Sequence, residues 1–80
     1  MTKYEEIVLL FDASVSNAGL AIAEIDSSVG GCVPEIIGKT AMIAFFTCNN
    51  KEWLEDRMRK AIKVIESYDI PFKKVRFKKV

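Results

Sequence analysis

The stretch FDASVSNAGLAIAEID, residues 11–26, decides how the chain folds, because it joins the first apolar segment to everything that follows. Asp12 ends a strongly apolar segment, a short polar loop comes next, and Gly19 precedes a second apolar segment. A carboxylate at the end of a buried strand can hold a metal ion for nuclease chemistry, or it can be the remnant of a lost site. We interpret residues 19–26 as a second β-strand.

The hydrophobic pattern on either side of this stretch predicts two further strands and a helix. The strand expected over residues 4–11 has a continuous apolar core, which is typical of a central strand covered on both faces. Residues 33–47 predict one long strand with a bulge at Gly38. Residues 50–68 place apolar side chains on one half of the helical circle, which predicts an amphipathic helix.

The ends of this helix carry recognisable signals. Asn49 followed by Glu52 has the spacing of a capping box, and Pro71 just beyond the helix fits a stop signal. Arg57 falls inside the apolar half, so its side chain must snorkel or find a partner. Residues 72–80 predict a fourth strand, which completes the order β-β-β-α-β.

The expected fold is therefore α/β: a mostly antiparallel four-stranded sheet with one long helix on one face. With 80 residues, of which half are apolar, the chain is long enough for a single domain, residues 1–80, with one small core. Its apolar segments are far shorter than the roughly 20 residues that span a bilayer. The acidic start is a poor secretory signal, so we expect a soluble, cytoplasmic protein without a membrane partner.

The content of cysteine and histidine excludes several kinds of site. Two cysteines, Cys32 and Cys48, are too few for a disulfide framework, and the chain has no histidine. Zinc-binding spacings and Ser-His or Cys-His catalytic pairs are therefore excluded. The two thiols are interpreted as buried and free, with a redox pair as the alternative.

Together with the element order, the opening stretch resembles the start of the RuvC-like Holliday-junction resolvases, in the ribonuclease H-like superfamily. The resemblance rests on Asp12 ending the first strand, Ser14 two residues on, the loop through Asn17, and residues 19–22 (GLAI) entering the second strand. It covers nearly all of this chain but only about the first half of the family's domain, and so implies a truncated ribonuclease H-like fold. Actin-like ATPases begin with a similar hairpin and are a second fold relative.

The resemblance implies that Asp12 is a carboxylate of a site for two Mg²⁺ or Mn²⁺ ions about 4 Å apart. The family's second carboxylate should come from the fourth strand, where its position falls on Phe77 or Lys78, and that strand contains no acid. One carboxylate is a weak metal anchor, so we expect a catalytically degenerate domain without a cofactor. A specific hypothesis places the Lys78 ammonium beside Asp12, where a metal would lie; the alternative is a solvated lysine at the end of the chain.

One helix covers one face of the sheet, which leaves apolar side chains on the other face without cover. Large exposed apolar patches usually mark interaction sites. The sequence leaves three candidates for the cover: a second copy of the chain, a different protein, or a rearranged segment of the same chain. In the loop after Asp12, the resemblance to actin-like ATPases implies phosphate binding by the side chains of Ser14, Ser16 and Asn17, with ordinary turn residues as the alternative.

The positive charge of the chain is concentrated at its C-terminal end. The net charge is +1, yet residues 71–80 hold five basic residues and no acidic one. Period two places Lys74, Arg76 and Lys78 on one face of the predicted strand, with Lys79 next to them. Such a row can follow a phosphate backbone, meet an acidic protein surface, or protect a sheet edge from aggregation.

The favoured interpretation is a degenerate RuvC-like domain that binds a partner protein, or itself, and so modulates nucleic-acid machinery. The size and the resemblance fit an origin in a phage or mobile element. One alternative is a metal-dependent, structure-selective nuclease completed by a second chain; besides Asp12, the acids near predicted strand ends are Glu24, Asp26 and Glu35. Another is a small DNA-binding protein that uses the basic C-terminal strand.

Overall fold

The computed structural model describes residues 4–45, 50–75 and 78–79. The elements in these ranges are β1 (Tyr4–Asp12), α1 (Ala18–Ser28), β2 (Cys32–Ile37), β3 (Thr40–Phe45), α2 (Lys51–Ser67), β4 (Phe72–Lys74) and β5 (Lys78–Lys79). Within these ranges, neither helix has the length and apolar character that crossing a bilayer requires.

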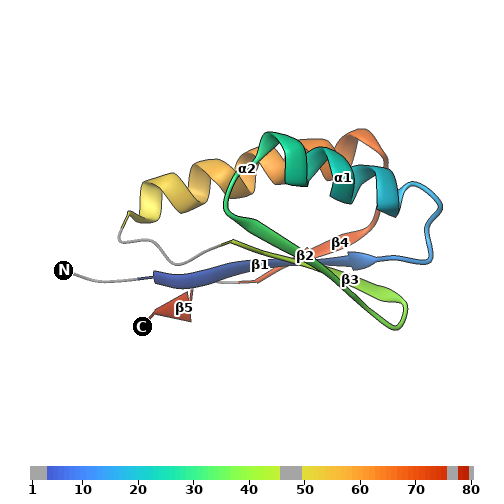
Figure 1. The fold of residues 1–80 in the computed structure, drawn as a ribbon, viewed down its shortest axis with the longest axis horizontal. Helices are drawn as coiled ribbons and strands as arrows, with labels where there is room; N and C mark the ends of the chain where they lie inside the picture. Colours follow the sequence, from blue (N-terminus) through green and yellow to red (C-terminus); the bar gives the residue numbers. More distant parts are fainter. Residues whose placement is uncertain (1–3, 46–49, 76–77, 80) are drawn as a thin grey trace.

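The sheet has the strand order β2-β3-β1-β4, and β5 pairs with the beginning of β1. Every pairing is antiparallel. It follows that β1 and β2 run parallel to each other with β3 between them, and that β3 and β4 run parallel with β1 between them. From β1 to β4, the order β-α-β-β-α-β with these split parallel pairs is the ferredoxin-like arrangement. Both helices lie on the same face of the sheet (Figure 1).

The α/β class, the mostly antiparallel sheet and the long helix are confirmed. The helix starts one residue later than expected, and its cap is Asn50, whose side chain accepts a hydrogen bond from the Trp53 backbone N–H at 3.1 Å. The cap expected at Asn49 is therefore wrong by one position, and Asn49 itself lies outside the described residues. Arg57 finds a partner as expected, because its guanidinium carbon lies 4.9 Å from the centre of the Trp53 ring.

The strand expected over residues 19–26 is wrong, because this stretch forms α1. Its buried side chains, Ala18, Ala21 and Ile25, recur every three to four residues, which is the period of a helix. Leu20, which a strand would have buried with its apolar neighbours, is 59% exposed. The expected order β-β-β-α-β is corrected to β-α-β-β-α-β-β, with two helices instead of one and five strands instead of four in the described ranges.

The long strand expected over residues 33–47 is instead a hairpin of β2 and β3. Ile37 pairs with Thr40, so that Gly38 and Lys39 form a two-residue turn. Gly38 has a φ of 62°, which side chains other than glycine rarely adopt and which a type II′ turn requires at its first central position. The glycine therefore marks a reversal of the chain and not a bulge.

The single strand expected over residues 72–80 is divided into β4 and β5. The two strands pair with different parts of β1, and the register along β1 shifts within the β5 pairing. The described residues therefore do not place Lys74 and Lys78 in one continuous period-two row, and Arg76 lies outside them.

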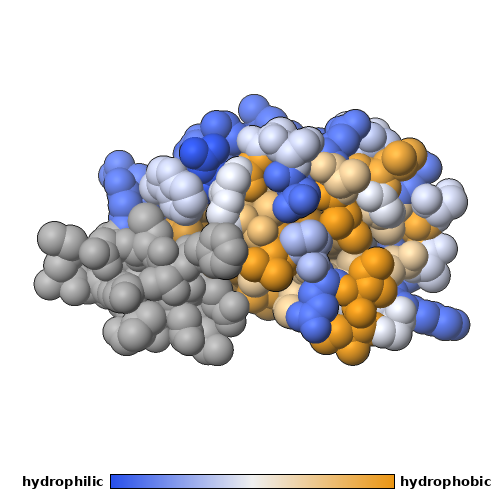
Figure 2. Space-filling view, in the orientation of Figure 1, coloured by the Kyte–Doolittle hydropathy of each residue, from blue (hydrophilic) through white to orange (hydrophobic). Residues whose placement is uncertain are grey.

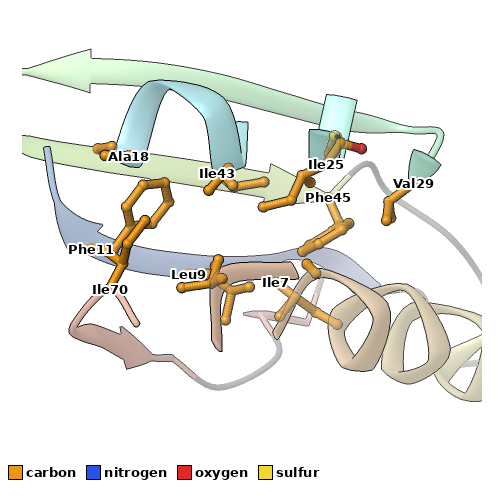
Figure 3. Close-up of a cluster of buried hydrophobic side chains, with 14 of the residues drawn as sticks. Ile7, Leu9, Phe11, Ala18, Ile25, Val29, Ile43, Phe45 and Ile70 are labelled. Carbon is orange, nitrogen blue, oxygen red and sulfur yellow. Dashed lines mark hydrogen bonds between the residues drawn. The ribbon is translucent and has the colours of Figure 1, made fainter. Parts of the chain in front are cut away.

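The core fills the space between the sheet and the two helices (Figure 3). From β1 it receives Ile7, Leu9 and Phe11, and from β3 it receives Ile43 and Phe45, all of them almost fully buried. Together with residues of α1 and α2, these side chains form one continuous hydrophobic cluster. Because alternate residues of each strand point to this layer, the residues between them point to the opposite face.

Cys32 is a buried free thiol, as expected. Its sulfur donates to the Ile25 carbonyl oxygen at 3.8 Å, and burial raises the pKa of the thiol above its ordinary value, as does the nearby charge of Asp26. Cys48 lies outside the described residues.

Candidate functional site on the open face of the sheet

The candidate site is the face of the sheet opposite the helices, which we call the open face. Val8 and Leu10 of β1 point to it and are half-buried, whereas their neighbours in β1 are buried under the helices. Residues that pair across strands lie on the same face, so the strand register identifies the other residues of the open face. Among the residues whose side chains the structure describes, the open face comprises Val8, Leu10, Asp12, Val33, Glu35, Ile37, Thr40, Met42, Ala44, Lys73 and Val75.

The central row of the open face has opposite charges at its two ends. Glu35 of β2 pairs with Met42 of β3, Met42 pairs with Leu10 of β1, and Leu10 pairs with Lys73 of β4. The glutamate and the lysine are three strand spacings apart, about 14 Å, which is too far for an ion pair within one copy of the chain. Between them lie only aliphatic side chains of the described sheet.

The next row of the open face is entirely apolar. Val33 pairs with Ala44, Ala44 pairs with Val8, and the Val75 backbone N–H donates to the Val8 carbonyl oxygen at 3.1 Å. The outer members of the row, Val33 and Val75, are 43% and 38% exposed. Hydrophobic surface gathers over the β2–β3 side of the molecule, where Ile37 is also exposed (Figure 2).

A hollow of about 540 Å³ lies at the end of the open face where β1 terminates. Its walls are Leu10, Phe11, Asp12, Lys39, Thr40, Pro71, Phe72 and Lys73. Asp12 is the one acidic side chain among these described lining residues, and two lysines face it from the hairpin turn and from β4. The hollow therefore combines an apolar floor with a mixed-charge rim.

Asp12 organises the loop that follows it. One of its carboxylate oxygens accepts a hydrogen bond from the Ser14 backbone N–H at 2.9 Å, which forms an Asx turn. The Ser14 hydroxyl, the same backbone N–H and the charge of Lys39 hold the pKa of Asp12 below its ordinary value. Hydrogen bonds to the charged form thus keep this exposed carboxylate ionised.

The structure brings the predicted loop residues together at this end of β1. Ser14, Ser16 and Asn17 are exposed there, and Asn17 precedes α1 without a side-chain capping hydrogen bond. Within the described ranges, no group of three or more Asp, Glu, Cys or His side chains is placed to hold a metal ion. Of the acidic residues considered as metal ligands, Asp12 is the one that lines the hollow in the described part of the chain.

The hypothesis of a Lys78–Asp12 pair is wrong. Lys78 pairs with Glu6, six positions before Asp12 along β1, and six residues of strand span about 20 Å. Lys79 pairs with Tyr4, still farther away. The nucleic-acid or acidic-partner role predicted for the basic C-terminal residues does not depend on Asp12 and stays a prediction.

The other acids considered for the site are scattered. Glu24 lies on α1, where one of its oxygens accepts a hydrogen bond from the Tyr68 hydroxyl at 2.5 Å, and this bond raises the pKa of Tyr68. Asp26 lies on the same helix, whereas Glu35 lies on the open face. Sequence reasoning considered Glu35 as a metal ligand and passed over Lys73. The two-residue turn at Gly38 is the signal that would have aligned Glu35 with Met42. The place of Lys73 depends on the pairing of β4 with β1, which brings together distant segments of the chain.

Comparison with protein-family models, with curated proteins and with solved structures finds no match to this chain.

Proposed function

We propose that this chain is a protein-binding domain and that the open face of its sheet is the binding surface. The observation that carries the proposal is the group of apolar side chains on the two central strands, Val8, Leu10 and Met42, on the face away from both helices. Central strands are usually the best-covered part of a sheet. In the described part of this chain they are covered from one side.

Burial of this face gives a direct free-energy gain. Removing apolar surface from water contributes about 25 cal/mol per Å². Contiguous apolar patches of this kind on small proteins mark interaction sites. The exposed Val33 and Ile37 extend the apolar surface to the β2 edge, which gives a partner continuous contact across the sheet.

The proposal keeps the partner-binding role expected from the sequence. The degenerate RuvC-like ancestry, and a role in modulating nucleic-acid machinery, stay predictions that the element order does not support. A nuclease needs several convergent carboxylates, whereas Asp12 is the one acid that the described residues bring to the hollow. This difference favours binding over catalysis.

A nucleic-acid surface is the weaker alternative. Single-stranded nucleic acids are held by aromatic stacking platforms within basic grooves. The described residues of the open face are mainly aliphatic, and Phe72 pairs with Phe11 on the helix side of the sheet. Lys73 supplies a cation at the edge of the face, which suits a charged rim around an apolar protein contact.

The test is site-specific photo-crosslinking in extract of the source cells. A photoreactive amino acid replaces Met42 on the open face or, as a matched control, the exposed Lys63 on α2. We expect adducts from position 42, either with the chain itself or with a different protein, and none from position 63. Excess unmodified chain should suppress the adducts with a different protein by competition. The absence of any adduct from position 42, including adducts with the chain itself, would overturn the proposal.

A further inference from the structure

We propose that the open face binds a second copy of this chain, through a two-fold axis that runs parallel to the strands. The inference rests on the proposed function, because it assigns an occupant to the same surface. The charge pattern of the central row and the positions of the exposed valines favour this occupant.

Two identical sheets that pack face to face in a closed dimer are related by an axis lying in the plane between them. An axis parallel to the strands exchanges the two edges of the sheet. It places β2 of one copy over β4 of the other, and β3 of one copy over β1 of the other. An axis across the strands instead places each strand over its own counterpart.

The charges of the central row select the first arrangement. With the axis between β3 and β1, Glu35 of each copy meets Lys73 of the other, so that one dimer gains two ion pairs. These two residues are about 14 Å apart within one copy and cannot pair there. An axis across the strands through the same row would bring each charge against its own counterpart, and like charges in an interface are strongly unfavourable.

The same axis also matches the apolar side chains. Val33 of one copy meets Val75 of the other, which brings together the two exposed valines at opposite ends of their row. Met42 of one copy meets Leu10 of the other at the centre. Aliphatic contacts therefore fill the middle and the ion pairs lie at the edges, as in an interface with an apolar core and a polar rim.

The size of the face sets the expected strength of the dimer. β2 and β3 are six residues long and β4 is three, so the four strands give a face of at most roughly 19 by 20 Å, or on the order of 400 Å² in projection. Standard interfaces bury about 800 Å² per partner. Because the face is smaller than this, we expect a reversible dimer and not a permanent one.

The test is sedimentation velocity on the complete chain and on charge variants, from sub-micromolar to near-millimolar concentration. We expect the wild type to dimerise, and Glu35→Lys or Lys73→Glu alone to raise the dissociation constant by about tenfold or more. The double variant, which exchanges the two charges, should return to near the wild-type value. An equimolar mixture of the single variants should form a heterodimer. Lys63→Glu, which makes the same charge change on α2, should leave the association unchanged.

Circular dichroism of each variant shows whether the fold is intact, which the exposure of both residues leads us to expect. A wild-type chain that stays monomeric over the whole range would overturn the second copy as the occupant. Dimerisation that the double variant fails to restore would overturn the orientation of the axis. If the monomeric chain still yields crosslinked adducts with a different protein from position 42, the proposed function stands while the dimer fails. If it yields no adduct at all, both fail.

Discussion

At the scale of single residues, Asp12 acts on its own loop. Its lowered pKa arises from the Ser14 hydroxyl and backbone N–H, with a smaller contribution from Lys39. We predict that Asp12 titrates below the ordinary value of 3.8 and that Ser14→Ala moves its pKa part of the way back, because the backbone N–H remains. Carboxyl-carbon NMR titration measures this, with Ser16→Ala as the control that leaves the pKa unchanged.

The sign of the linked stability effect follows from the same shift. The pKa of Asp12 is lower in the folded chain than in the unfolded chain, so its ionised form stabilises the folded state. This stabilisation is fully present above the unfolded-state pKa of 3.8 and is lost as the pH falls through the lower folded-state pKa. The difference in urea midpoint between the wild type and Asp12→Asn should therefore shrink in that acidic window. A pKa for Asp12 at or above 3.8 would contradict this account of the loop.

Sequence reasoning placed Asp12 correctly at the end of a central strand but gave it the wrong neighbour. The pairing of Lys78 with Asp12 required one unbroken strand over residues 72–80. The chain instead divides this segment and pairs its end with the start of β1. A register across strands is set by contacts between distant segments, so one sequence read locally does not determine it.

At the scale of elements, α1 shows where local pattern reading fails. Over the short stretch 19–26, apolar residues fit period two and the helical period about equally well. The three alanines in residues 18–23 favour a helix, and this propensity is the signal that could have decided the assignment. The longer α2 was predicted because four turns leave no such ambiguity.

The burial pattern of α1 gives a direct test of the helix. Ala21 is fully buried and Leu20 is 59% exposed. We predict that Ala21→Leu overpacks the core and lowers the free energy of unfolding by about 1–3 kcal/mol. Leu20→Gln should change it by less than about 0.5 kcal/mol, as a surface substitution does. Urea unfolding measures both, and the reverse ranking would favour the strand over the helix.

At the scale of the whole molecule, the fold is two layers with one core. Sequence reasoning expected a face of the sheet without helical cover, and the described residues show such a face even though a second helix was missed. The reason is that both helices connect strands across the same face of the sheet: α1 connects β1 to β2, and α2 connects β3 to β4 (Figure 1). The second helix therefore lies in the same layer as the first, and the opposite face of the sheet has no helical cover in the described part of the chain.

Two adjacent residues of β3 test whether one face of the sheet forms the core while the other is open. Ile43 is fully buried beneath the helices, whereas Met42 lies half-buried at the centre of the open face. We predict that Ile43→Ala costs about 2–5 kcal/mol of unfolding free energy, a large part of the stability of so small a domain. Met42→Ala should cost less than about 1 kcal/mol when urea unfolding is measured at a concentration where the chain is monomeric.

The dependence of stability on protein concentration further distinguishes Met42 on the open face from Ile43 in the core. A dimer that forms through the open face stabilises the folded state by mass action, so the wild-type melting temperature should rise with protein concentration and that of Met42→Ala should rise less. Ile43→Ala should instead lower the melting temperature at every concentration. Equal losses for the two variants in the monomeric range would mean that a segment of the same chain covers Met42. The sheet would then have no face to offer a partner.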